Sequence, residues 1–446
     1  MSTVLNRRNL LRASGAAVGL LATPTFFVRN AWSQDFTNNP GDSPVVKFGF
    51  NVPQTGSYAD EGADELRAYE LAVKHINEGG GMLETIDPLA LGGNGVLGKK
   101  VEFVTGDTQT NADAARESAR RMIERDGVVM FSGGSSSSVA VAQQYLAQEL
   151  GVVFMCGLTH SNDTTGKDRR RYGFRHMFNA HMTGLALGSV LADAYGKDRM
   201  AYHLTADYNW GHSQYESIKA ATEAQGWQTA NNIMTPLGAG DFSQFITSVL
   251  ASDADVLVLN HYGRDMVNSL TQAIQFGMRD LQKNGKDFQV VVPLYSRLMA
   301  SGAGSEAVAD VFGTTNWNWA LAETDAGSKA FVDSFEAEYG FPPSQAAHTC
   351  YVQALMYADA CERAGTFNPT EVIATLEGHA FTGTSPGEAF YRAEDHQCFK
   401  DILVVRGKRP SERENDHDFL AIVNSVERDY IVDNFAPDLF PGDLDA

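Results

Sequence analysis

Four consecutive serines, Ser135–Ser138, stand between an apolar run and a helical pattern, and their hydroxyl groups suggest two kinds of chemistry. Together with His160 and Asp207, one serine could complete the Ser-His-Asp triad of a hydrolase. A nucleophile elbow requires GxSxG, however, and the run here reads GGSSSS. Hydroxyls beside the free N–H groups of a helix start suit a carboxylate or another anion instead. We therefore favour ligand binding, with an ordinary helix N-cap as the alternative for one serine.

The remaining motifs do not predict catalysis. The sequence contains no HExxH, no P-loop pattern GxxxxGK[ST] and no metal-ligand spacing. Gly93–Gly98 matches GxGxxG, but a loop precedes it and an expected strand follows it. The dinucleotide fingerprint requires the reverse order, a strand before and a helix after. We interpret the match as a turn, and expect no enzyme activity, no cofactor and no metal.

Short β-rich runs alternate with helical patterns from Val45 onward, in two successive series. In the first expected helix, apolar residues between Leu66 and Ile76 repeat at helical spacing, and three glycines end the pattern. Repeated βα units predict open, mostly parallel, doubly wound sheets. At 446 residues the chain exceeds one ordinary core. The sequence therefore predicts an α/β protein with two similar Rossmann-like lobes.

Five expected strands end in loops rich in hydroxyl, imidazole and aromatic side chains. Ligands of open α/β sheets bind at the carboxyl ends of the strands, so we expect a cleft lined by both lobes. A purely structural role in a loop or lobe core remains the alternative for the histidine and the aromatic residues. The residues after these strands are Ser135–Ser138, Leu158–His160, Asp207–Trp210, His261–Tyr262 and Leu294–Tyr295.

The amino-terminal residues predict export. Asn6–Arg12 carries a twin-arginine pattern, a broken apolar stretch follows, and Ala31–Ser33 offers a cleavage site. We interpret residues 1–33 as a twin-arginine signal peptide and expect a periplasmic protein. Removing them takes away four arginines and no acidic residue, which changes the net charge from −20 to −24. This charge argues against nucleic acid or an anionic membrane as a partner.

The four cysteines form no CxxC pair. Cys350 and Cys361 are expected on one helix, eleven residues and about 16 Å apart, beyond the reach of a disulfide. A bond between Cys361 and Cys398 stays open. Twin-arginine substrates fold before export in a reducing compartment, so we expect a fold that depends on no bridge.

These segments together resemble the type I periplasmic solute-binding proteins of the leucine/isoleucine/valine-binding group, the receptors of ABC importers. The resemblance covers residues 45–407, and is carried by VVKFGFNVPQTGSYADEGADELRAYELAVKHINEGGG, GVVMFSGGSSSSVAVAQQYLAQELGVVFMCGLTH and RMAYHLTADYNWGHS. It implies two lobes that close over a solute by a hinge motion. The implied lobes are 45–178 plus 318–388 and 179–317 plus 389–425, followed by an acidic tail, 426–446. The implied hinge crossovers lie near 178–181, 314–319 and 388–400.

The resemblance also implies a site. It matches the family's carboxylate-binding serines to Ser136 and Ser137, and the loops and aromatic positions around them to the other residues. The expected ligand-binding residues are Tyr58, Ser136, Ser137, Leu158, His160, Trp210, Tyr262 and Tyr295. Trp317 and Trp319, at the second crossover, suit either a ring-shaped solute or hinge packing.

One position departs from the amino-acid binders. Where they place a glutamate that meets the ligand's ammonium, this chain has Leu294. A buried ammonium without a charge partner is costly, which argues against an ordinary branched-chain amino acid. Glu61 or Asp207 could substitute. We expect a monomer that captures a small amino-acid-like solute or organic acid and delivers it to an ABC permease. A periplasmic sensor that feeds a signalling partner is the alternative.

Overall fold

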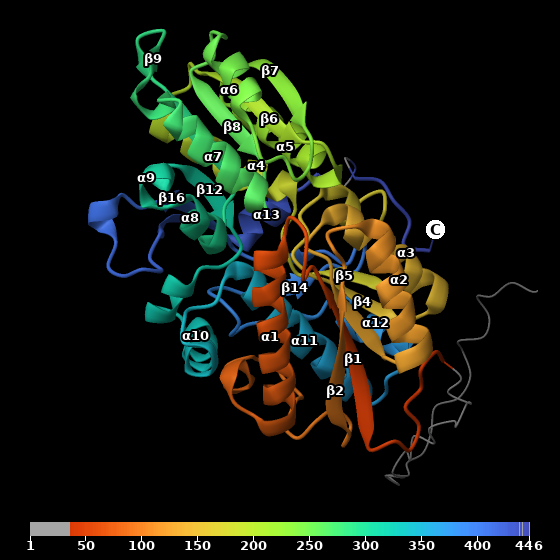
Figure 1. The fold of residues 1–446 in the computed structure, drawn as a ribbon. Coiled ribbons are helices and arrows are strands. Elements are labelled where there is room, and N and C mark those ends of the chain that lie inside the picture. The colour runs from red at the N-terminus through yellow and green to blue at the C-terminus, as the bar shows by residue number, and fades with distance from the viewer. Residues whose placement is uncertain (1–35, 437, 439, 446) are drawn as a thin grey trace, which may run out of the picture. The chain divides into compact units, whose positions relative to one another are not determined.

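The computed structural model describes residues 36–436, 438 and 440–445, so the predicted signal peptide lies outside the described residues. Its first sheet has five parallel strands in the order β2-β1-β3-β4-β5 (Figure 1). Strands β3 and β4 are buried throughout, as expected of parallel strands covered on both faces. The strands are β1 (Val45–Val52), β2 (Lys100–Asp107), β3 (Met130–Gly133), β4 (Val153–Cys156) and β5 (Gly173–Arg175).

Helices cover both faces of this first sheet. On one face α1 (Ala59–Glu78) packs against α11 (Gln345–Ala364), which in turn contacts α12 (Pro369–Leu376). On the other face α2 (Ala112–Arg121) packs against α3 (Ser137–Leu150). The first lobe is thus doubly wound, and it includes helices from the last third of the chain.

The second sheet has seven strands in the order β17-β16-β12-β11-β8-β6-β7. Strands β12, β11, β8, β6 and β7 run parallel to one another. Strand β16 pairs antiparallel with β12, and β17 pairs antiparallel with β16. The strands are β6 (Met200–Ala206), β7 (Gln228–Thr235), β8 (Val256–Asn260), β11 (Gln289–Leu294), β12 (Phe312–Thr315), β16 (Ile402–Gly407) and β17 (Leu420–Val426).

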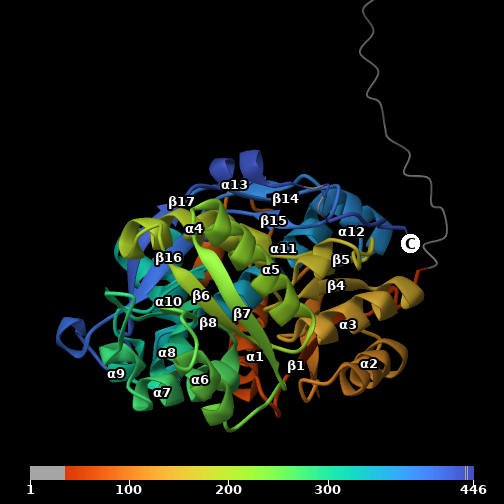
Figure 2. The ribbon, with the colours of Figure 1, turned by 90° about the horizontal axis from the view of Figure 1, so that it is seen from above.

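Two groups of helices cover the second sheet (Figure 2). The first is α4 (Ala180–Tyr195) with α5 (Asn209–Ala224), and the second contains α6 (Ser243–Leu250), α7 (Gly263–Gln275), α8 (Arg297–Ala303) and α9 (Ser305–Val308). The predicted two-lobed α/β class is therefore confirmed. Helix α10 (Ala326–Tyr339) precedes α11, and α11 carries both Cys350 and Cys361, as the sequence predicts.

The chain passes between the two sheets near the three expected crossovers. It leaves β5 at Arg175 and enters α4 at Ala180, and it leaves β12 at Thr315 before α10. It returns through a small antiparallel sheet and reaches β16 at Ile402. The strands of this small sheet are β13 (Ala380–Phe381), β14 (Ala389–Tyr391) and β15 (Cys398–Phe399). At the second crossover Trp317 is buried, stacks on His348 of α11 at 4.7 Å and donates to Ser328 of α10.

Sequence reasoning missed the small sheet of β13, β14 and β15, and it missed one edge strand of the first large sheet and both edge strands of the second. β5 has only three residues, while β7 and β17 are largely exposed. β5 is buried but too short to show a pattern, whereas the exposed positions of β7 and β17 carry polar residues that hide theirs. The two-stranded ribbon of β9 (Gln282–Lys283) and β10 (Lys286–Asp287) was missed as well.

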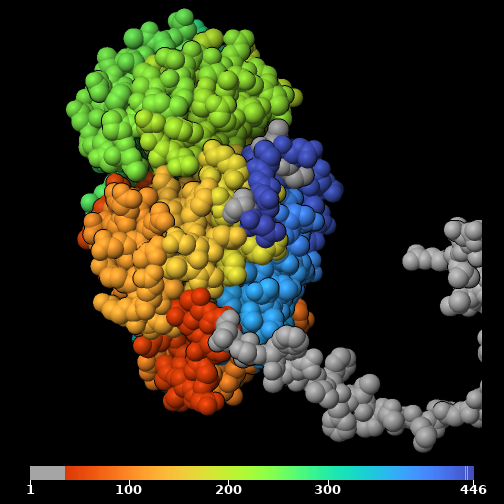
Figure 3. All heavy atoms as spheres, turned by 90° about the vertical axis from the view of Figure 1, so that its right-hand side faces the viewer, coloured from red at the N-terminus to blue at the C-terminus, as the bar shows by residue number. Residues whose placement is uncertain are grey.

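The C-terminal segment packs on the rest of the molecule. After α13 (Arg428–Asn434), Phe435 contacts the rings of Phe399 and Phe440. The Leu444 carbonyl accepts a hydrogen bond from the Arg171 amide at 2.7 Å. Figure 3 shows this segment, in dark blue, lying beside yellow residues of the middle of the chain.

The four cysteines are buried and all carry free thiols, so the open pairing of Cys361 with Cys398 is not formed. Within the described residues, no helix is long and apolar enough to cross a membrane. The same part of the chain holds no group of three or more His, Cys, Asp or Glu residues placed for a metal ion.

Candidate functional site

The loops after the strands of both sheets meet, and His160 lies at their junction. Its Nδ1 accepts a hydrogen bond from the Trp210 indole N–H at 2.8 Å, which joins the loop after β4 to the start of α5. An indole N–H can only donate, so the proton of neutral His160 is on Nε2, which lies 3.0 Å from the Thr183 hydroxyl. Burial, with a smaller contribution from Arg175, lowers the pKa of His160 well below its usual value. His160 is therefore a neutral residue that orients Trp210.

Four aromatic side chains surround this junction; we call Tyr58, Tyr208, Trp210 and Tyr262 the aromatic cluster. The Tyr262 ring lies 5.8 Å from that of Tyr58 and 6.1 Å from that of Trp210, both edge to face. The Tyr58 and Tyr208 hydroxyls are 2.7 Å apart. Gln345, at the start of α11, donates to the Tyr262 hydroxyl at 2.8 Å. Both lobes thus contribute to one buried aromatic wall.

The serine run, hereafter the serine turn (Ser135–Ser138), begins α3. Ser135 donates to Glu65, and Ser138 donates to Asn209 at 2.7 Å. The Ser137 hydroxyl accepts from the backbone N–H groups of the loop after β4, at 3.4 Å from His160 N and 3.1 Å from Ser161 N. Ser136 is the N-cap residue, yet its side chain makes no capping bond. Three of the four serine hydroxyls are thus hydrogen-bonded to other groups of the protein.

Of two more predicted residues, Leu158 lies at the junction and Tyr295 does not. Leu158 is buried next to the serine turn, and its backbone bonds to Glu65. Tyr295 is fully buried, and its amide donates to Thr314 O at 2.8 Å. The charged and phenolic neighbours that act on its hydroxyl are Arg279 and Tyr195, within the second lobe. The structure therefore does not bring Tyr295 together with the aromatic cluster.

The next residues along, Ser296 and Arg297, do reach the other lobe. Ser296 lies 3.4 Å from a carboxylate oxygen of Glu61, and it also interacts with the Tyr262 hydroxyl. Arg297 is buried, and its Nη2 lies 4.0 Å from Asp64. The loop after β11 thus contributes through these two residues rather than through Tyr295.

Carboxylates of α1 line the same junction. Glu61, Asp64 and Glu65 are 2%, 1% and 0% exposed, and they share a helix face because they are three and four residues apart. Burial raises the pKa of Glu61 and that of Glu65 to about 8. Asp207, the other candidate carboxylate, is exposed and lies 2.8 Å from His212.

A cavity of about 230 Å³ opens between α1 and the helices of the second lobe. Arg264 and Asp60 stand at this cavity 3.9 Å apart. Its other lining residues are Glu61, Gly263, Val267, Leu298, Met299 and Gly302. Gly263, which lines the cavity, directly follows Tyr262 in the chain, so the cavity adjoins the junction described above.

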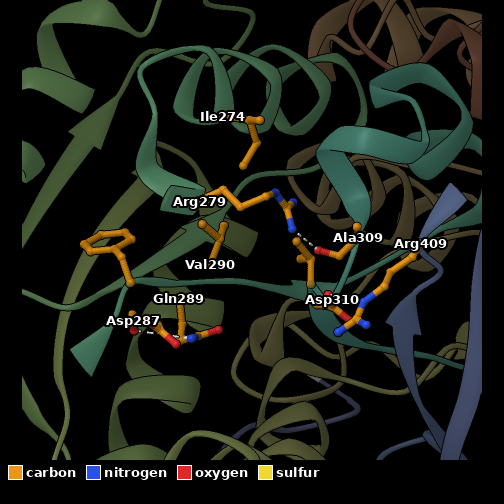
Figure 4. Close-up of a pocket in the computed structure, with 10 residues that line it drawn as sticks. Ile274, Arg279, Asp287, Gln289, Val290, Ala309, Asp310 and Arg409 are labelled. Atoms are coloured by element: carbon orange, nitrogen blue, oxygen red, sulfur yellow. Dashed lines mark hydrogen bonds and ion pairs between the residues drawn. The ribbon is translucent and has the colours of Figure 1, made fainter. Parts of the chain in front are cut away.

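A second cavity, of about 330 Å³, lies away from this junction (Figure 4). Arg279 donates to Ala309 O at 2.6 Å, and Arg409 pairs with Asp310 at 2.8 Å, so both guanidinium groups are occupied by the protein. Gln289 and Val290, in its lining, begin β11. The cavity therefore lies at the amino end of that strand, the end opposite to the one where α/β sheets bind ligands.

Residues 45–414 match a protein family described as periplasmic binding protein. The chain belongs to this family. It is a family of binding proteins rather than enzymes, and membership implies a periplasmic location. Over 345 residues this binding protein is 26% identical to Leu/Ile/Val-binding protein homolog 8 of Brucella abortus (strain 2308), covering 74% of this chain and 80% of the relative.

Solved structures confirm the fold of this binding protein. A periplasmic binding protein from Burkholderia mallei superposes with a TM-score of 0.78 at 24% identity, covering 89% of this chain and 98% of that one. A solute binding protein of an ABC transporter from Rhodopseudomonas palustris BisB5, in complex with 3,4-dihydroxy benzoic acid, gives 0.73 at 20% identity, covering 86% and 98%.

Sequence reasoning missed several residues of the junction in this binding protein. Tyr208 belongs to the loop Asp207–Trp210 that it had singled out but was not chosen as a ligand-binding residue. Ser296 follows the chosen Tyr295, and Gln345 begins a helix from the last third of the chain. Asp64 and Glu65 had a usable signal, because acidic residues one turn apart fall on the buried side of an amphipathic helix. Glu61 alone had been considered.

Proposed function

We propose that this binding protein captures a small organic solute between its lobes and delivers it to the membrane permease of an ABC importer. The observation that carries the proposal is the hydrogen bond between His160 and Trp210, since it joins the carboxyl-end loops of the two sheets beside the aromatic cluster. Relatives named as ABC transporter substrate-binding proteins support the transport role. Export by the twin-arginine route, with residues 1–33 as the signal, is part of the proposal.

The solute in this proposal is amino-acid-like or an organic acid. Tyr58, Trp210 and Tyr262 offer faces and edges for an apolar or ring-shaped part. Ser136, whose hydroxyl makes no capping bond, and the α3 amides offer donors for a carboxylate. A similar fold occurs with benzoate in a protein from R. palustris and with isoleucine in one from Streptococcus pneumoniae, so it accommodates both classes.

A thermal-shift screen of the protein with amino acids, amides, aromatic acids and amines tests the proposal. A solute that binds only the folded state at 100 times its Kd stabilises it by about 2.7 kcal/mol, which raises the unfolding midpoint by several degrees. Trp210→Ala should remove the shift, since truncating a central aromatic contact typically costs about 2 kcal/mol or more of binding.

Trp227→Phe serves as the control for this screen. Trp227 is also a buried tryptophan of the second lobe, but it donates to Gly196 O at 2.9 Å and lies beyond the C-terminal end of α5, whereas Trp210 lies at the start of that helix. Its substitution should lower the midpoint while preserving the ligand-induced shift. A solute whose shift survives Trp210→Ala would overturn the assignment of the site, and a screen without any shift would overturn the proposed class of solute.

A further inference from the structure

Glu61 and Glu65 lie one turn apart on α1, and we call these two residues the carboxylate face. Both are almost completely buried, and Glu65 Oε2 has no hydrogen-bond partner among the described residues. Within the part of the chain that the structure describes, the Glu61 carboxyl group accepts one side-chain hydrogen bond, from Ser296 at 3.4 Å, and it lines the cavity of about 230 Å³. Buried carboxylate oxygens that lack partners are costly for a protein to maintain. The carboxylate face therefore holds unused capacity to accept hydrogen bonds.

The nearby cations do not use this capacity. Arg297 is buried, and its Nη2 lies 4.0 Å from Asp64. It also acts electrostatically with Glu61, but its Nε and Nη2 make no hydrogen bond within the described residues. Asp64 also accepts from the Ser344 amide at 2.9 Å. At the cavity, Arg264 lies 3.9 Å from Asp60 rather than from Glu61. The junction thus has more acidic groups than it has cations to pair with them.

The aromatic cluster adds an independent reason to expect a cation. Tyr262 and Tyr58 stand next to the carboxylate face, and both carboxylates act electrostatically on the Tyr262 hydroxyl. Aromatic faces and carboxylates together are typical of sites for ammonium groups. A solute with only a carboxylate would instead place its negative charge beside Glu61 and Glu65, which is unfavourable when these residues are ionised.

We propose that the carboxylate face binds an ammonium or amidinium group of the solute, with Glu61 in direct contact and Glu65 one turn behind it. The inference rests on the proposed function and names the class of solute, an organic cation or zwitterion. The carboxylate face would give the ammonium group a charge partner from the first lobe, whereas position 294 in the second lobe carries the apolar side chain of leucine. Glu61 and Glu65 would then determine specificity.

Binding of a cation should release protons. Without a ligand the raised pKa values keep the carboxylate face largely protonated at pH 7, while a bound ammonium favours the ionised form. The titratable and charged groups around the face are Asp60, Asp64, Tyr262, Arg264 and Arg297. Affinity for a cation should therefore rise from pH 6 to pH 8, and the binding heat should depend on the ionisation enthalpy of the buffer.

Isothermal titration calorimetry with matched solutes provides the test. Leucine is compared with 4-methylpentanoate, phenylalanine with 3-phenylpropanoate, and benzylamine with benzoate, in phosphate and in Tris buffer. We expect an amine-bearing solute to bind most tightly and to release protons. Glu61→Gln should weaken it by about 10- to 100-fold, Glu65→Gln by less, and neither should change the affinity of a desamino compound more than twofold.

Asp207→Asn is the matched control, because it removes an exposed carboxylate near Trp210 and should leave every affinity unchanged. Circular dichroism melts verify that each variant is folded. Tight binding of the desamino acids in preference to the amines would overturn this inference and leave the proposed function intact. If neither Glu61→Gln nor Glu65→Gln changed the affinity for the amines, this inference would likewise be overturned and the proposed function would stand. Failure of all six compounds to bind would overturn both proposals.

Discussion

The serine turn and the carboxylate face lie in the same lobe and touch through Ser135 and Glu65, yet their polar groups are used differently. The serine turn has the composition of a ligand loop, but Ser135, Ser137 and Ser138 are bonded to protein groups. The carboxylate face has the composition of an ordinary amphipathic helix, but it retains an unpartnered oxygen. Residue type alone therefore does not indicate which polar groups are available to a ligand.

The physical difference is in what surrounds each group. A hydroxyl can both donate and accept, so it finds a partner within a crowded turn easily. A carboxyl group has more acceptor sites than protons to donate, and the N–H groups of α1 beyond its first turn are already bonded within the helix. The helix thus carries its carboxylates into the junction without satisfying them.

The largest effect that separates the two regions should be the pH dependence of stability. Each glutamate of the carboxylate face has a pKa of about 8 in the folded protein, above the usual value of 4.5 for glutamate. Its contribution to stability is therefore fully present below pH 4.5 and is lost as the pH rises through 8. Glu65→Gln removes this loss, so the variant should gain roughly 2–4 kcal/mol relative to the wild type between pH 5 and pH 8.

Urea unfolding of both proteins across this pH range measures the difference. The wild type itself also responds to buried histidines, whose lowered pKa values reduce stability at acid pH, so the difference between the two proteins is the quantity to compare. Parallel curves for wild type and Glu65→Gln would mean that Glu65 is ionised in the folded state.

A smaller effect should distinguish two neighbouring serines. Ser137→Ala leaves the amides of His160 and Ser161 without their shared acceptor, which should cost about 1–3 kcal/mol of the free energy of unfolding. Ser136→Ala removes a hydroxyl without a capping bond and should change it by less than about 0.5 kcal/mol. Urea titrations at pH 7 give both values. Equal losses would show that the serine turn acts as a unit and that the present distinction is wrong.

The smallest effect concerns ligand affinity in the Ser136→Ala variant. If Ser136 donates to a solute carboxylate, as predicted, its removal should weaken a zwitterionic solute by about 2- to 10-fold. Benzylamine, which lacks a carboxylate, should bind the variant and the wild type equally. Calorimetry with phenylalanine and benzylamine makes the comparison. A loss for both compounds would indicate a change of shape rather than a lost hydrogen bond.

Much of the fold was predictable because buried parallel strands and amphipathic helices have strong local patterns. The runs around β1, β3 and β4 and the helix α11 needed only apolar composition and spacing. The edge strands β7 and β17 were not found, since their exposed faces carry polar residues. The site was predictable to the extent that it follows from strand ends, as His160, Trp210 and Tyr262 demonstrate.

The amino-acid sequence by itself determined the two-lobed α/β class, the family and the loops at which the lobes meet, because these depend on residues near one another in the chain. Only the tertiary structure decided how polar groups are paired. Among the described residues, the buried hydroxyl of Tyr295 and one oxygen of Glu65 have no hydrogen-bond partner, whereas Asp207 is exposed and lies beside His212. Hydrogen bonding joins residues that are distant in sequence, so the helical pattern that places Asp64 and Glu65 on the buried side of α1 could not show which of their oxygens would find partners.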